Sequence, residues 1–178
     1  MVVIFMNKDY KRYSVIIKGT KPLLMNNPNS MNAPKEGKET PVEALLFKNK
    51  KGQIYQPSEP IIQMMKDSAY KHKGKKISSL VNAFLEIEPM EIIHTNQNWE
   101  IFENQVVIQH KDRITKKRPM LREGWELEFT MISLNEQLTG AMLKDILEYA
   151  GTFNGLGDWR PQKGGRYGRF VVTKFEEI

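Results

Sequence analysis

Glycine, arginine and aromatic residues are mixed in one run of the chain, residues 151–170, and these residue types suit the binding of an anion that carries flat rings. Six of the chain's 12 glycines lie in this run. Glycine has no Cβ, so the backbone at such positions can take positive φ angles and approach a ligand closely. Arginine offers planar donors to phosphate oxygens, and an aromatic ring offers a face on which a base can stack. The candidate contacts here are Trp159, Arg160, Lys163, Arg166, Tyr167 and Arg169.

The spacing of these glycines excludes two common phosphate-binding motifs. No Gly-Lys-Ser or Gly-Lys-Thr follows them, as a P-loop requires. The run also lies between an expected helix and an expected strand, whereas a dinucleotide fingerprint follows a strand and opens a helix. A structural explanation stays open, in which the glycines only shape a helix-to-strand connection while Phe153 and Tyr167 close the core.

Positive charge is clustered along the chain. Three stretches hold 15 of the 27 lysines and arginines and only two acids, Asp67 and Asp112, while acids gather in residues 86–103 and 123–128. This polarity is expected of a protein with one face that meets an anion. The three cationic stretches are residues 66–76, 110–122 and 159–169. The further residues expected to contact phosphates are Lys73, Lys75, Lys76, Lys111, Arg113, Lys116, Lys117 and Arg118.

Composition limits the class of protein. There are no cysteines, which excludes disulfides and cysteine-ligated zinc or iron–sulfur sites. No apolar run approaches the length of a membrane span, so we expect a cytoplasmic protein without a membrane partner. The chain has no His-x-x-x-His pair and no suggestive cluster of carboxylates, so we expect neither a metal nor another cofactor.

Three histidines are the candidates for acid–base catalysis: His72, His94 and His110. General acid–base chemistry needs a histidine positioned by partners within hydrogen-bonding distance. His72 and His110 lie in cationic stretches, and His94 reads as a buried or edge-strand residue. Asp158, the acid of the glycine-rich run, reads as a structural partner of loop amides or of an arginine. The sequence therefore predicts no catalytic residue.

Hydrophobic periodicity and turn residues predict one α+β domain over residues 1–178. A capping box at Thr40 predicts a short helix, Asn135 is expected to cap the last helix, and Gly151 to end it. Residues 26–39 have little periodicity and predict a flexible insertion that orders on a partner. Strands are expected at 12–18, 53–56, 85–89, 91–94, 99–102, 105–109, 125–132 and 170–175. Of these, 91–94 extends the sheet of 85–89, and 99–102 and 105–109 form a hairpin or two short strands. Helices are expected at 40–48, from 57 into the basic stretch 66–76, at 78–84 and at 135–151.

The order strand, helix, strand, strand, helix, strand predicts a ferredoxin-like, RNA-recognition-like antiparallel sheet with helices on one face and inserted loops. The glycine-rich loop at 151–169 would connect the last helix to the last strand.

The chain also resembles a known family. The run from Gly155 to Pro161, Gly-Leu-Gly-Asp-Trp-Arg-Pro, with Gly164 to Phe170, Gly-Gly-Arg-Tyr-Gly-Arg-Phe, is similar to the C-terminal glycine-rich loop of the RAMP superfamily, the RNA-recognition-like proteins of CRISPR systems. The stretch Gly19 to Met25 resembles the opening of backbone-type RAMP proteins and of a class of phage and plasmid proteins. The resemblance implies an RNA-recognition-like fold that grips a single strand, often as repeated subunits, through Arg160, Arg166 and Arg169. It also implies that residues 26–39 take the place of a thumb-like insertion.

These observations predict a non-catalytic protein that binds single-stranded RNA or DNA largely independently of sequence and assembles as a homo-oligomer along the strand. Two alternatives stay open. One is a metal-independent RAMP-type endoribonuclease, and the other is a phage or plasmid factor that binds an acidic host protein. The choice between RNA and DNA also stays open, because contact with a 2′-hydroxyl leaves no signature in a sequence.

Overall fold

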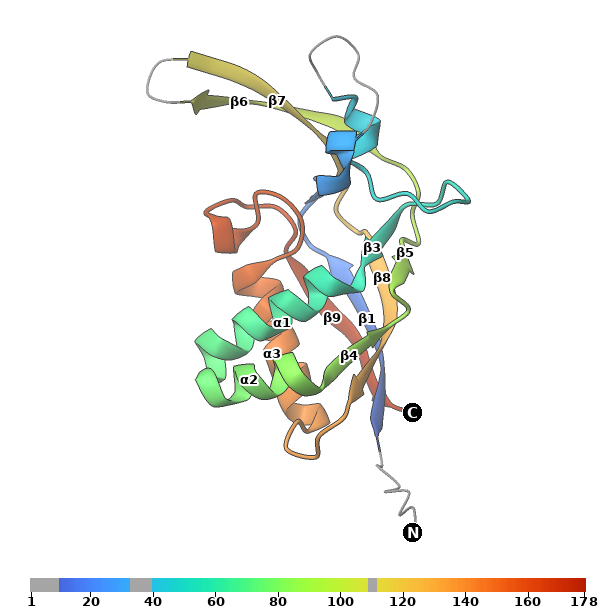
Figure 1. The fold of residues 1–178 in the computed structure, drawn as a ribbon, viewed down its shortest axis with the longest axis vertical. Helices are drawn as coiled ribbons and strands as arrows, with labels where there is room; N and C mark the ends of the chain where they lie inside the picture. The colour runs from blue at the N-terminus through green and yellow to red at the C-terminus, as the bar shows by residue number, and fades with distance from the viewer. Residues whose placement is uncertain (1–9, 33–39, 109–111) are drawn as a thin grey trace.

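A computed structural model describes residues 10–32, 40–108 and 112–178. Its larger part is an antiparallel sheet with helices on one face (Figure 1). The strands lie in the order β4-β8-β1-β9. They are β1 (Lys11–Gly19), β4 (Leu85–Glu88), β8 (Glu126–Ser133) and β9 (Phe170–Glu177). This order and the connections through the helices confirm the predicted ferredoxin-like α+β fold.

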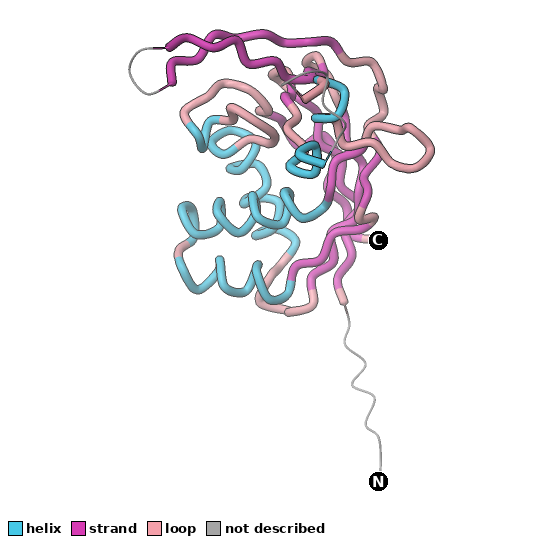
Figure 2. Tube along the Cα trace, turned by 45° about the horizontal axis from the view of Figure 1, so that its top comes forward, coloured by secondary structure: helices cyan, strands magenta, loops and turns pink. Residues whose placement is uncertain are grey.

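Three helices cover one face of the sheet, and Figure 2 shows both layers side by side. They are α1 (Ser58–Lys73), α2 (Lys75–Phe84) and α3 (Gly140–Tyr149). Apolar residues recur at helical spacing in α1 and α3, and alternate along β1 and β8, so each element has one apolar face. Ile61 and Met65 of α1, Ile146 of α3, and Val15 and Ile17 of β1 are fully buried in this core. None of the helices in the described part of the chain is long and apolar enough to cross a membrane.

A long hairpin projects from the layered part, at the top of Figure 1. It consists of β6 (Glu100–Ile108) and β7 (Asp112–Leu121), and β2 (Leu23–Leu24) pairs with the base of β7. The prediction of separate strands at 99–102 and 105–109 was wrong, because both belong to β6. Asn104 is followed by glutamine rather than by the glycine that a two-residue turn favours, so nothing stops the strand there. The cationic stretch 110–122 is therefore mostly a strand.

Two short connections differ from their predictions. Thr40 does not cap a helix: a 3₁₀ turn, η2 (Val42–Leu45), starts after Pro41 without a side-chain cap. Residues 91–94 do not extend the main sheet, since β5 (Glu91–Ile93) pairs with β3 (Tyr55–Pro57). Within the predicted insertion 26–39, Pro28–Asn32 form a second 3₁₀ turn, η1. Residues 33–39 lie outside the described residues.

Both predicted ends of the last helix were wrong. Thr139 is the N-cap, and its hydroxyl accepts a 3.3 Å hydrogen bond from the Met142 amide. Asn135 instead makes a local turn, in which its side chain accepts from the Gln137 amide. At the other end the backbone continues through Gly151 as a π-helical turn, η3 (Ala150–Asn154), and ends at Gly155. Position 151 requires glycine because of close packing and not because of its backbone angles: a Cβ there would lie 2.3 Å from the Phe170 carbonyl oxygen.

Candidate nucleic-acid interface

Because residues 151–154 belong to η3, the glycine-rich loop in the structure consists of residues 155–169. It is fixed by backbone hydrogen bonds to the chain that follows β1. The Asp158 amide donates to the Leu24 carbonyl at 2.8 Å, the Gly168 amide donates to Pro22 at 2.7 Å, and Arg169 accepts from Thr20 at 2.8 Å. A Cβ at Gly157 would lie 2.3 Å from the Leu24 oxygen, so this close approach requires glycine. The loop and the 19–25 stretch, far apart in the sequence, therefore form one structure.

The loop also closes on itself. The Leu156 amide donates to Gly168 at 2.9 Å, and the Gly165 amide donates to Arg160 at 3.0 Å. Trp159 has a φ of +47°, a conformation that residues with a Cβ rarely adopt. The loop thus holds a strained tryptophan in a fixed position, which is the kind of strain that often accompanies a functional site.

Hairpin β6–β7 rests on this loop through an ion pair and an aromatic cluster. Arg118 Nε donates to Asp158 at 2.7 Å, and both side chains are largely buried. The ring of Phe102 lies 5.8 Å from that of Trp159 and 5.2 Å from that of Tyr167, edge to face. Asp158 is thus paired with an arginine, one of the two kinds of structural partner predicted for it. Phe102 was not predicted as part of this cluster; its position follows only if β6 is one strand, because alternate residues of a strand share a face.

Several predicted phosphate contacts are held by partners inside the protein. Arg160 donates to the Gly157 carbonyl at 3.0 Å and to Gln162 at 3.1 Å. Arg169 donates to the Thr152 carbonyl at 3.2 Å, and Lys73 pairs with Asp145. Like Arg118, these cations bind groups inside the protein, so fewer of their N–H donors are free to bind a phosphate.

Other predicted cations are exposed and lie on the hairpin, on the loop and at the turn between α1 and α2. Lys117 has one long contact, 3.5 Å, with Glu103, and Lys116 is half-buried. Lys111 lies outside the described residues. The exposed predicted cations are Arg113, Lys117, Lys163, Arg166, Lys75 and Lys76.

All three cationic segments lie along one side of the molecule. On the left of Figure 1, from bottom to top, are the α1–α2 turn, the glycine-rich loop and the far end of the hairpin, and Figure 2 shows the same side of the molecule. We call this the basic side: the 66–76 turn, the 155–169 loop and β7. The fold thus brings together stretches that are separated by dozens of residues in the sequence.

The opposite charge gathers on the sheet face away from the helices. Glu126 lies beside Lys18, Glu128 beside Ile16, and Glu86 beside Ile132 in the register of β1, β8 and β4. Glu88 is paired with Arg12 at 2.8 Å. We call this the outer sheet face; its described residues on β1, β4 and β8 include no aromatic side chain.

The histidines differ sharply in environment. His94 is 1% exposed, neither ring nitrogen has a hydrogen-bond partner, and burial lowers the pKa of the imidazole to about 4. His72 Nε2 lies 3.1 Å from Asp145 Oδ2, and hydrogen bonds from Lys73 and then His72 hold the pKa of this carboxyl below its usual value. His110 lies outside the described residues. His94 is thus a buried residue, which is one of the two alternatives left open by the sequence.

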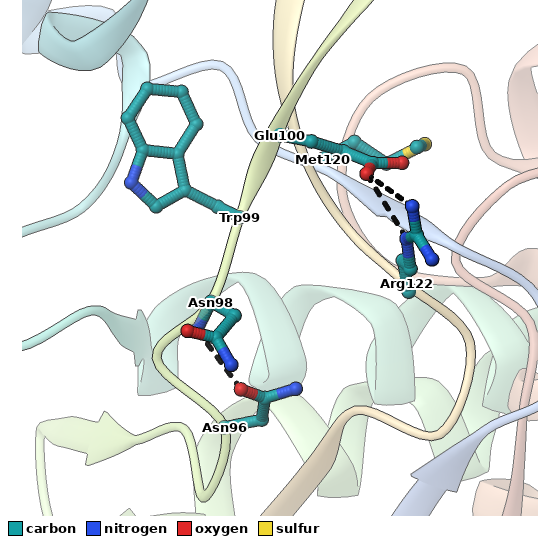
Figure 3. A pocket seen from close by; sticks show the side chains of 6 residues that line it. All are labelled: Asn96, Asn98, Trp99, Glu100, Met120 and Arg122. Carbon is teal, nitrogen blue, oxygen red and sulfur yellow. Dashed lines mark hydrogen bonds and ion pairs between the residues drawn. The ribbon is translucent and has the colours of Figure 1, made fainter.

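One pocket lies at the base of the hairpin and another beside the glycine-rich loop. One, of about 310 Å³, is shown in Figure 3, where Trp99 points away from Glu100 and Arg122. Glu100 accepts two hydrogen bonds from Arg122, 2.8 and 3.0 Å, so each neutralises the other. The second, of about 390 Å³, lies between the start of α1 and the loop and includes Phe47, Gln56 and Arg160. Among the described residues, no three histidine or carboxylate side chains gather as a metal site would require.

Comparison with known proteins supports the fold through a solved structure rather than through sequence. No family model matches the chain, and no curated protein matches it in sequence. A chain in the cryo-EM structure of the Type III-B Cmr-beta bound to cognate target RNA has the same fold, with a TM-score of 0.67 and 12% identity. The match covers 95% of this chain and 61% of that chain, so this chain spans about three fifths of its length. The chain therefore shares the fold of that Cmr-beta chain.

Proposed function

We propose that the protein binds single-stranded RNA along its basic side and that its contacts tolerate any base sequence. The observation that supports this proposal most strongly is that the cationic α1–α2 turn, the glycine-rich loop and strand β7 lie on one side of the molecule. Clustered lysine and arginine along one track suit the phosphate backbone of a nucleic acid, and such contacts carry no base specificity.

The outer sheet face is an unsuitable place for this binding. RNA-recognition domains stack bases on aromatic residues of the corresponding face. Here that face presents Glu86, Glu126 and Glu128, which repel phosphate, and its described residues on β1, β4 and β8 include no aromatic. An RNA strand is therefore directed to the hairpin and the loop.

Aromatic residues beside the cations favour a single strand over a duplex. Bases of a single strand can stack on protein rings, whereas those of a duplex are stacked on one another. The Phe102, Trp159 and Tyr167 cluster lies directly at the junction of hairpin and loop. The structural neighbour was determined bound to its target RNA, which favours RNA as the polymer.

The test is a fluorescence-anisotropy titration with labelled single-stranded RNA, single-stranded DNA and duplex RNA. The variant replaces Arg113, Lys116 and Lys117 of β7 by glutamine. The matched control replaces three cations away from the basic side, Lys18, Lys50 and Lys51, and so lowers the net charge equally. We expect the hairpin variant to lose affinity about tenfold or more while the control stays close to wild type. Equal losses in both variants, or no single-strand binding by wild type, would contradict the proposal.

We also propose that successive copies bind along one strand. The acidic outer sheet face and the basic side are complementary in charge, which would favour contact between neighbouring copies. Mass photometry with RNA of increasing length should show bound mass rising in steps of one protein. A single bound copy at every length would exclude such assembly.

A second candidate function, metal-independent RNA cleavage, rests on His72. Its Nε2 is 3.1 Å from Asp145, so a carboxylate orients the ring as general acid–base catalysis requires. Cleavage of labelled RNA in the presence of EDTA that is lost in His72→Asn would favour this candidate. Intact RNA after long incubation with wild-type protein would exclude it.

A further inference from the structure

Three aromatic rings lie in a row between α1 and the end of α3, the first pair stacked and the second tilted. The His72 and Tyr149 rings are 4.5 Å apart with an interplanar angle of 16°. The Tyr149 and Phe153 rings are 4.6 Å apart at 35°. We call these three residues the aromatic ladder. None of them belongs to the Phe102, Trp159 and Tyr167 cluster at the hairpin.

The ladder is held in place by the surrounding polar groups. Asp145 binds both His72 and Lys73, which fixes the His72 ring relative to α3. At the outer end, Arg169 donates to the carbonyl of Thr152, the neighbour of Phe153. The backbone here is the π-helical turn η3, a rare conformation that often occurs at functional sites. The outer ring is therefore presented by a rigid support.

Phe153 is exposed although phenylalanine is strongly apolar. Its exposed fraction is 57%, so the explanation that it closes the core was wrong. The packing of α1 against α3 explains the positions of the His72 and Tyr149 rings. It leaves the side of Phe153 that faces away from Tyr149 in water. An exposed ring at the end of a rigid stack is ready to receive another flat ring.

The charge around the ladder suits a nucleotide. Asp145 is paired with Lys73 and lies within hydrogen-bonding distance of His72, and the adjacent Lys71, Lys75 and Lys76 are exposed. Arg169 lies at the other end. The ladder thus lies between two parts of the basic side, the α1–α2 turn and the glycine-rich loop, where a phosphate backbone would bring bases within reach.

We infer that the aromatic ladder is a base-stacking site, on which one unpaired base of the bound RNA packs against the outer face of Phe153. This inference rests on the proposed function and adds a contact remote from the hairpin. Stacking of this kind accepts any base, because every base has a π-face.

The test combines binding with photochemical cross-linking. An oligouridine that contains 5-iodouridine is irradiated with wild-type protein, and the cross-linked peptides are identified by mass spectrometry. We expect a cross-link at Phe153 or Tyr149. In anisotropy titrations, Phe153→Ala and Phe153→Leu should weaken binding about five- to 100-fold, the range for loss of one stacked base, whereas Phe153→Trp should bind like wild type.

Tyr10 provides the matched control, because it is an aromatic residue with 51% exposure that lies just before β1, outside both the basic side and the ladder. Tyr10→Ala should bind RNA like wild type. If wild type binds RNA but all Phe153 variants bind equally well, or the cross-links fall only at Trp159 and Tyr167, the ladder inference is wrong and the proposed function stands. If wild type binds no RNA, both are wrong.

Discussion

At the scale of single residues, His94 shows how burial alone changes chemistry. Its ring packs edge to face on Trp125 at 6.2 Å, and the residue is 1% exposed. Neither ring nitrogen has a hydrogen-bond partner in the described structure, so a charged imidazole would be buried without compensation. The folded protein therefore holds His94 neutral, with a pKa of about 4.

This depressed pKa predicts a loss of stability in mild acid. The unfolded chain binds a proton at His94 with a pKa of about 6.5, and the folded chain does so only near 4. The contribution is fully present above pH 6.5 and is lost as the pH falls towards 4, by roughly 2 to 3 kcal/mol in total. Urea unfolding at neutral pH and near pH 4.5 measures it.

The comparison needs a variant that cannot titrate. His94→Phe should show a smaller decrease in unfolding free energy between the two pH values than wild type does. An identical pH dependence in wild type and His94→Phe would contradict the assignment.

At the scale of elements, the glycine-rich loop depends on close contacts that only glycine permits. A Cβ at Gly165 would lie 1.6 Å from the carbonyl oxygen of Trp159, so any side chain must displace the loop backbone. Gly164, its neighbour, has a φ of +79° and no atom within 4 Å of the position of a Cβ. The two glycines therefore serve different purposes.

Alanine at these two positions should have unequal effects. Gly164→Ala carries only the cost of left-handed backbone, about 1–2 kcal/mol. Gly165→Ala should destabilise the protein by more, roughly 3 kcal/mol, and displace Trp159. Thermal unfolding with tryptophan fluorescence measures both effects. Equal effects of the two substitutions would show that the loop does not pack as described.

The sequence predicted the main sheet and its helices because their apolar residues recur with clear periods. It did not predict that the hairpin packs on the glycine-rich loop. The strands β6 and β7 are exposed, and they are held in place by pairing with each other and by contacts with the loop. Arg118 was predicted as a phosphate contact, yet it is paired with Asp158, and that contact depends on two segments 40 residues apart. Likewise, the helix beyond Gly151 depends on its packing against β9 rather than on any local stop signal.

At the scale of the whole molecule, charge is divided between two surfaces. The chain has a formal net charge of +6, but the outer sheet face carries Glu86, Glu126 and Glu128 beside Lys18, while the basic side carries a cluster of exposed cations. The clustering of charge in the sequence indicated this polarity, although the fold was needed to show that the three cationic stretches share one side. A polyanion approaching this molecule is steered towards the hairpin and the loop.

The most direct test of this account is the salt dependence of binding to single-stranded RNA. Wild type should show a linear fall of log affinity with log salt, at about −0.7 per phosphate contacted. Replacing Arg113, Lys116 and Lys117 by glutamine should make the slope shallower by about 2, the value for three lost contacts, whereas replacing Lys18, Lys50 and Lys51 should leave it unchanged. An unchanged slope in the hairpin variant, or binding that does not respond to salt, would contradict the assignment of the basic side as the RNA-binding surface.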